Sequence, residues 1–69
     1  MSRTIVQCSG GFRILNEKGT SERIVSVPGE IISMSANGDN ATVVYKKNGG
    51  KLATVFELKH GTSIKSFGI

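Results

Sequence analysis

The stretch TVVYKKNGGKLATVFEL, residues 42–58, decides the fold class of this chain. Two runs rich in Val, Thr, Tyr and Phe, Thr42–Lys46 and Leu52–Leu58, flank the dipeptide Asn48-Gly49. Asparagine and glycine both tolerate the positive φ angles that a type I′ turn demands, so this dipeptide between two such runs is a strong β-hairpin signal, and Asn37-Gly38 gives the same signal earlier in the chain. A helix is disfavoured because no window sustains apolar residues at spacings of three and four. The stretch therefore predicts two antiparallel strands.

Glycine-bearing turn signals recur along the whole chain and separate short runs rich in β-branched and aromatic residues. The turn signals are Ser9-Gly10-Gly11, Lys18-Gly19-Thr20, Pro28-Gly29, Asn37-Gly38-Asp39-Asn40, Asn48-Gly49-Gly50 and Lys59-His60-Gly61. The predicted strands are Thr4–Cys8, Phe12–Asn16, Arg23–Val27, Glu30–Ser35, Thr42–Lys46, Leu52–Leu58 and Ser63–Phe67. We therefore expect a single all-β domain over residues 1–69, an antiparallel meander of about seven short strands that forms a small barrel, a sandwich or a propeller-blade-like sheet.

The predicted strands also suggest an internal three-strand repeat. The first unit comprises Thr4–Ser9, Phe12–Gly19 and Ile24–Val27, and the second comprises Glu30–Ser35, a run ending at Asn48-Gly49, and Val55–Leu58. The run Thr62–Phe67 resembles the opening strand of a third unit. The alternative is that any meander of amphipathic hairpins resembles itself at this level. An incomplete third unit would leave an edge strand with unpaired backbone groups, which a second copy can complete.

Several strands carry apolar residues on both faces. Val43 and Val44 are adjacent, and the strand from Leu52 to Leu58 places Leu52, Thr54, Phe56 and Leu58 on one face and Ala53 and Val55 on the other. A chain of 69 residues has little left to cover a second face. Either the sheet folds over itself, or a partner covers it.

The short strands and glycine-centred turns resemble those of β-propeller blades over most of the chain. The chain departs from the best-known blade family because it has no tryptophan and no Gly-His to Trp-Asp pairing, and its apparent unit has three strands where a blade has four. We interpret the resemblance as a common property of β-meanders.

The net charge of +4 belongs to the C-terminal half. Residues 1–40 are balanced, with four basic and four acidic side chains, whereas residues 41–69 hold five lysines against Glu57 alone. Three of these lysines, Lys46, Lys47 and Lys51, crowd the predicted hairpin tip, and Lys59 and Lys65 are expected on neighbouring strands. Lysines at a tip can neutralise phosphates.

The lysine-rich tip, together with Lys59 and Lys65, is thus a candidate nucleic-acid site, for which Tyr45 would supply a stacking face. Single-strand binders usually present several exposed aromatic rings, however, and Phe12, Phe56 and Phe67 are predicted to lie in the core. Lysines on a turn also serve solubility and protect sheet edges. Carbohydrate binding is disfavoured because the chain lacks tryptophan.

The inventory of chemistry-bearing side chains predicts no enzyme, no cofactor and no metal site. Cys8 and His60 are the only conceivable nucleophile pair, and we interpret them as a small buried hydrophobe and a polar turn residue. One cysteine excludes an internal disulfide, and with one histidine it cannot complete a structural zinc site. Asn37-Gly38-Asp39-Asn40 offers one carboxylate, too few for a calcium loop.

The sequence therefore predicts a non-enzymatic binding and assembly module. We expect it to act through a protein partner, as a homo-oligomer, with assembly edges on the terminal strands around Val6 and Ile64. The alternative function is nucleic-acid binding by the lysine-rich tip. A cytoplasmic location without membrane contact is expected, because no export signal or apolar span is visible and a lone cysteine suits a reducing compartment.

Overall fold

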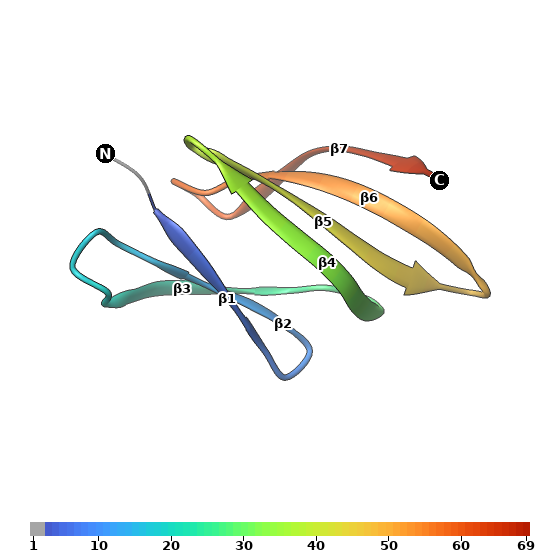
Figure 1. The fold of residues 1–69 in the computed structure, drawn as a ribbon, viewed down its shortest axis with the longest axis horizontal. Helices are drawn as coiled ribbons and strands as arrows, with labels where there is room; N and C mark the ends of the chain where they lie inside the picture. Colours follow the sequence, from blue (N-terminus) through green and yellow to red (C-terminus); the bar gives the residue numbers. More distant parts are fainter. Residues whose placement is uncertain (1–2) are drawn as a thin grey trace.

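The computed structural model describes residues 3–69, which form seven antiparallel strands and contain no helix. The strands are β1 (Thr4–Cys8), β2 (Gly11–Leu15), β3 (Ser21–Ser26), β4 (Glu30–Asn37), β5 (Asn40–Lys47), β6 (Gly50–Glu57) and β7 (Thr62–Gly68). They form a three-stranded sheet of order β1-β2-β3 and a four-stranded sheet of order β4-β5-β6-β7, without closing into a barrel (Figure 1). The predicted all-β meander is confirmed, and of the predicted shapes the two-sheet arrangement is the one adopted.

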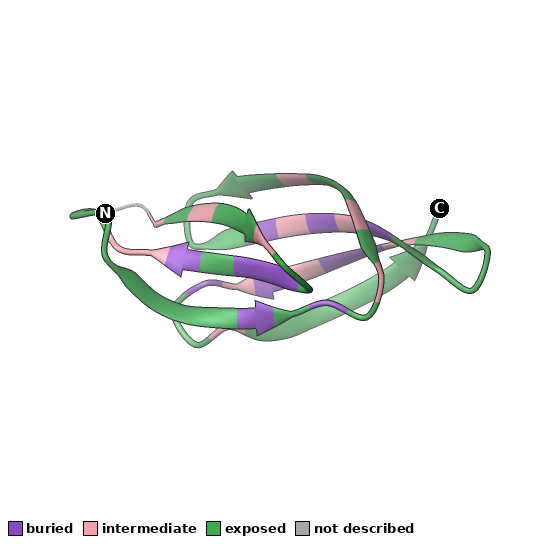
Figure 2. Cartoon of the chain, turned by 90° about the horizontal axis from the view of Figure 1, so that it is seen from below, coloured by how far each residue is buried: buried purple, intermediate pink, exposed green. Residues whose placement is uncertain are grey.

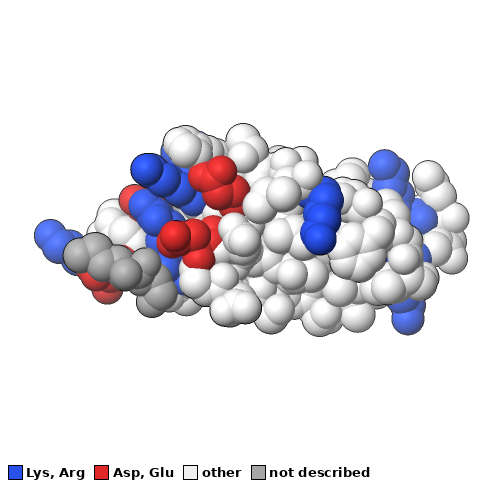
Figure 3. All heavy atoms as spheres, turned by 90° about the horizontal axis from the view of Figure 1, so that it is seen from above, with Lys and Arg blue, Asp and Glu red and all other residues white. Residues whose placement is uncertain are grey.

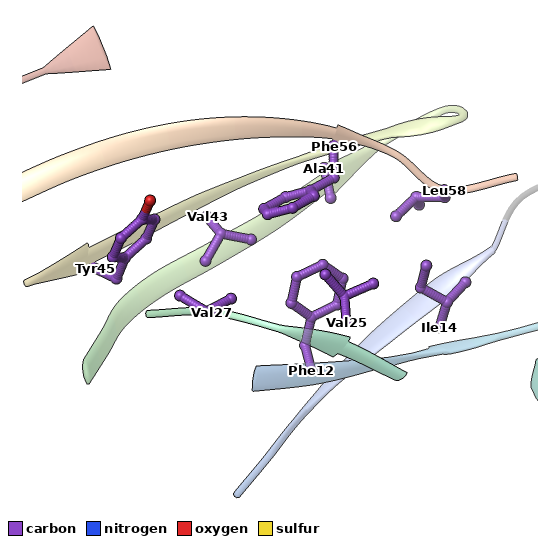
Figure 4. Packing of buried hydrophobic residues seen from close by; sticks show 9 residues of the cluster. All are labelled: Phe12, Ile14, Val25, Val27, Ala41, Val43, Tyr45, Phe56 and Leu58. Carbon is purple, nitrogen blue, oxygen red and sulfur yellow. The ribbon is translucent and has the colours of Figure 1, made fainter. Parts of the chain in front are cut away.

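The core lies between the two sheets. The middle strands β2 and β5, together with β3, β6 and the residues that follow them, supply its buried side chains (Figure 4): Phe12, Ile14, Val25, Val27, Ala41, Val43, Tyr45, Phe56 and Leu58. The rings of Phe12 and Phe56 meet edge to face across the layers, with centroids 5.1 Å apart and planes inclined by 71°. The molecule measures only 16 Å along its shortest axis, so this single layer of side chains is its whole core.

Alternation along β5 and β6 determines which side chains enter the core. Tyr45 pairs with Leu52, and Val43 pairs with Thr54, on the face that looks toward the other sheet. The intervening residues of each strand point outward, because successive side chains of a strand alternate between faces. The predicted division of this segment into two faces is confirmed. Leu52, Thr54, Phe56 and Leu58 lie on the side of the core, and Ala53 and Val55 lie on the outer side.

The chain passes from one sheet to the other between β3 and β4. Proline has no N–H to contribute to a strand ladder, so Pro28 fits this short connection. At Gly29 the backbone runs so close to β5 that a Cβ atom would lie 1.8 Å from the carbonyl oxygen of Lys46. Only glycine therefore allows the crossover to pack against β5 in this way.

The predicted internal repeat is visible in the hydrogen bonding that ends each unit. The N–H of Val27, after β3, donates to the carbonyl oxygen of Gly10, before β2, at 2.9 Å. In the second unit the N–H of Leu58, after β6, donates to the carbonyl oxygen of Asp39, before β5, at 2.8 Å. The two units thus face each other with equivalent strands, and β7 adds to the second unit as an extra strand.

Two hairpin turns have different geometries although both contain Asn-Gly. Asn48 and Gly49 have φ angles of 52° and 79° between the paired residues Lys47 and Gly50, as predicted for a type I′ turn. In the β4–β5 hairpin the strand continues through Asn37, so Gly38 and Asp39 form the turn and only Gly38 has a positive φ angle. This is the pattern of a type II′ turn, so the type I′ turn predicted at Asn37-Gly38 is wrong: β4 extends through Asn37 and leaves Gly38 as the first turn residue.

The predicted second strand includes Asn16, but in the structure this residue begins the β2–β3 turn. Its side-chain Oδ1 accepts hydrogen bonds from the backbone N–H groups of Lys18 at 2.9 Å and Thr20 at 3.0 Å. An asparagine that bonds nearby backbone groups in this way favours a turn over a strand. The third strand starts at Ser21, two residues before the predicted position.

Candidate interaction surfaces

The lysine-rich tip is the β5–β6 hairpin, at one end of the long axis of the molecule (Figure 1). Lys46, Lys47 and Lys51 are all exposed there, and Lys46 pairs directly opposite Lys51 across the two strands. Glu30 on β4 pairs with Lys46 from the other side and supplies an acidic neighbour. Because side chains alternate along β5, Lys47 points to the opposite face from Lys46. The three lysines therefore do not form one flat patch.

The charges of the chain are unevenly placed along its length. In the view of Figure 3, acidic atoms lie only toward the end that carries the N-terminus, where they mix with basic ones, and the opposite end shows basic atoms only. Lys59 lies in the β6–β7 turn, and Lys65 lies in the middle of β7. The structure thus separates the five lysines of the C-terminal half among the hairpin tip, a turn and an edge strand.

Tyr45 and Phe67 have the opposite exposures from those predicted. The Tyr45 ring lies in the core and keeps 6% of its surface accessible, so it presents no face for stacking at the lysine-rich tip. Phe67, predicted to be a core residue, is 46% exposed. The reason is the strand register: Tyr45 shares the inward face with Val43, whereas Phe67 pairs with Ala53 on the outward face.

A chain of three hydroxyl groups crosses the inward face of the four-stranded sheet. The Tyr45 Oη atom lies 3.1 Å from Thr54 Oγ1, which lies 2.9 Å from Ser66 Oγ. Thr54 is 3% exposed and is the one buried polar residue of the part of the chain that the structure describes. Both of its neighbours satisfy its hydroxyl, as burial of a polar group requires.

Strand β7 forms one edge of the four-stranded sheet and is exposed at all seven residues (Figure 2). None of its side chains belongs to the core cluster. Three large apolar side chains, Ile64, Phe67 and Ile69, are exposed on it or directly after it, which is half of those exposed in residues 3–69. Ile64, predicted as an assembly edge, lies at a register shift between β6 and β7.

The other predicted assembly edge, around Val6, lies on β1 at the edge of the three-stranded sheet. Val6 is exposed and belongs to the outward row Val6–Arg13–Ile24, in which Ile24 is exposed as well. The structure therefore places both predicted residues on exposed edge strands, in different sheets. Whether these edges take part in assembly stays a prediction.

Sequence reasoning missed an apolar row on the outward face of the four-stranded sheet. Val44 pairs with Ala53, which pairs with Phe67. Ala53 is 3% exposed although it points away from the core, because it lies between these two larger side chains. The adjacent valines 43 and 44 predicted apolar groups on both faces, but the position of Phe67 in this row follows from the β6–β7 register.

Cys8 and His60 do not form a dyad. His60 Nδ1 lies 2.5 Å from Glu57 Oε1 within the β6–β7 turn, whereas Cys8 pairs with Gly11 in the β1–β2 hairpin. Within residues 3–69, no three side chains of His, Cys, Asp and Glu are grouped so as to hold a metal ion. The same residues include no helix long and apolar enough to cross a membrane. No protein-family model, curated protein or solved structure matches this chain.

Proposed function

We propose that this chain is a non-enzymatic binding and assembly module that acts through protein–protein contacts and self-associates as a homo-oligomer. The observation that carries the proposal is β7, an edge strand exposed along its whole length beside three exposed apolar side chains. An edge strand with unpaired backbone groups is a template for pairing with another chain. Apolar side chains gathered on that edge add a desolvation gain when a partner covers them.

The thin core supports the same function. The cluster between the sheets contains only nine residues, and no internal disulfide reinforces it because Cys8 is the single cysteine of the sequence. A domain of about 60 residues buries only about 60% of the surface that its unfolded chain exposes. Oligomerisation commonly adds to the stability of domains of this size, because it buries further apolar surface.

The test is the mass of the purified protein in solution, measured by sedimentation over a range of concentrations and by native mass spectrometry. We expect species of two or more copies that dissociate on dilution. A protein that stays monomeric at every concentration would contradict the proposal. The ultraviolet absorbance ratio of the same sample reports any nucleic acid that co-purifies.

Nucleic-acid binding is the second candidate function. The exposed lysines Lys46, Lys47 and Lys51 favour it, because they give one end of the molecule a basic surface (Figure 3). Removing one lysine that binds a phosphate should lower the slope of log affinity against log salt by about one. We expect the triple alanine variant of these lysines to lose most of the salt dependence if this candidate is correct.

The matched control for nucleic-acid binding removes the same charge elsewhere. Arg13, Lys18 and Arg23 are exposed and lie outside the β5–β6 hairpin. Their triple alanine variant should retain the salt slope if the hairpin tip is the binding site. Equal losses in both triple variants, measured with a labelled single strand by fluorescence anisotropy, would indicate non-specific attraction to net charge and would remove the candidate.

A further inference from the structure

We propose that the partner of β7 is a second copy of this chain, paired antiparallel with β7 about a two-fold axis that passes beside Ser66. The two four-stranded sheets would then form one continuous sheet of eight strands. This inference rests on the proposed function and specifies its interface. A two-fold interface uses the same surface on both copies, so it must be self-complementary.

Strand β7 is the least protected of the four sheet edges. On the edge strand β3, Glu22 and Arg23 are both charged, and Glu22 Oε1 accepts a hydrogen bond of 2.8 Å from Arg3 Nε. The edge strands β1 and β4 approach each other across the two sheets, and each packs apolar side chains against the core, Ile5 from β1 and Ile31 and Met34 from β4. Charged side chains and coverage are the usual means by which proteins protect edges. Along β7 the only charge is Lys65.

The backbone of β7 offers hydrogen-bonding groups to a neighbour. The N–H of Ile69 donates to the carbonyl oxygen of Lys51 at 3.2 Å, so this residue directs its backbone groups toward β6. Backbone direction alternates along an antiparallel strand, which turns the N–H and C=O groups of Ser66 and Gly68 away from β6. A second strand can therefore pair with them.

Charge and overlap select the register of the pair. Centring on Lys65 places like charges directly opposite each other, which is destabilising. Centring on Phe67 leaves only Ser66–Gly68 of each strand overlapping within β7. Centring on Ser66 overlaps Ile64–Gly68, with Ile64 of the register shift at the end of the overlap, and places Lys65 opposite Phe67 of the second copy.

The Ser66-centred register is complementary on the outward face. Lys65 and Phe67 both point outward, opposite Val55 and Ala53, so the ammonium group of each copy can lie against the aromatic ring of the other. The outward row Val44–Ala53–Phe67 then continues across the axis into the row Lys65–Val55 of the second copy. Contact between the two β7 edges alone is small, so we expect a dimer that dissociates on dilution.

Disulfide trapping tests this register directly. In a Cys8→Ser background, Ser66→Cys places two thiols opposite each other across the axis. Opposed residues of a hydrogen-bonded pair have Cα atoms about 5.5 Å apart, within the range of about 4.4–6.8 Å that a disulfide spans. We expect a covalent dimer on mild oxidation. The control is Ser63→Cys on the same strand. In this register the two introduced cysteines, one on each copy of β7, are offset by six residues along the strands and would lie about 20 Å apart.

A charge exchange provides the second test. Phe67→Lys places a lysine opposite Lys65 of the second copy, so self-association measured by sedimentation should weaken about tenfold or more. Adding Lys65→Glu should restore it, because each introduced lysine then faces an introduced glutamate. Both positions are exposed, and circular dichroism checks that the variants fold.

The outcomes of these tests distinguish a failure of the β7 interface from a failure of the proposed function. A wild-type protein that is monomeric at all concentrations contradicts both. An oligomer that Ser66→Cys does not trap, that Ser63→Cys traps equally well, or that the double charge variant fails to restore contradicts the β7 interface alone.

Discussion

At the scale of single residues, Thr54 connects the core to the edge strand. Its hydroxyl lies between that of Tyr45, in the core, and that of Ser66, on β7. The three groups satisfy one another beside the apolar side chains of the core. Because β7 adds no side chain to the core, this contact is the one side-chain hydrogen bond that the described residues make between β7 and the rest of the sheet.

Replacing Thr54 by valine should lower the free energy of unfolding by about 1–3 kcal/mol, because the nearly buried Tyr45 hydroxyl loses its partner. The matched control is Ser66→Ala, which removes the other end of the chain of hydroxyls at an exposed residue. We expect that change to cost about 1 kcal/mol or less. Urea denaturation measures both, and an equal cost in the two variants would contradict the central role of Thr54.

At the scale of elements, the crossover between β3 and β4 determines how the two units face each other. The loop is short and leads directly from the last core residue of the first unit, Val27, to the first strand of the second. It packs against β5 so closely that a Cβ atom at Gly29 would lie 3.1 Å from the Tyr45 ring as well as against the Lys46 carbonyl group.

Gly29→Ala should therefore destabilise the protein by about 1–3 kcal/mol, through the overpacking that a methyl group causes at this contact. The control is Gly50→Ala in the β5–β6 hairpin, where the nearest atom to a new Cβ lies at 3.7 Å and φ is not positive. We expect its effect to stay within about 0.5 kcal/mol. Thermal unfolding distinguishes the two, and equal midpoints would show that β5 moves to accept the methyl group.

At the scale of the whole molecule, the sequence predicted the strands well and their placement in space less completely. The strand count, the type I′ turn at Asn48 and the division of β6 into two faces follow from local rules of φ angle and alternation. The exposures of Tyr45 and Phe67 do not, since each depends on which strands pair, in which register, and how far the opposite sheet extends. The candidate lysines were located on their elements, but their distribution over two faces and both ends required the fold.

The whole molecule also connects assembly to stability. If two copies pair through β7, association adds to the free energy of folding by mass action, and the unfolding midpoint rises with protein concentration. We expect the wild-type midpoint to increase over a hundredfold range of concentration, and the midpoint of Phe67→Lys to begin to increase only at concentrations about tenfold or more higher. The exposed position of Phe67 matters here, because its loss should leave the core between the sheets unchanged. A wild-type midpoint independent of concentration, in a sample that sedimentation shows to be oligomeric, would mean that the copies associate without stabilising the fold. Calorimetry at low and high concentration decides this.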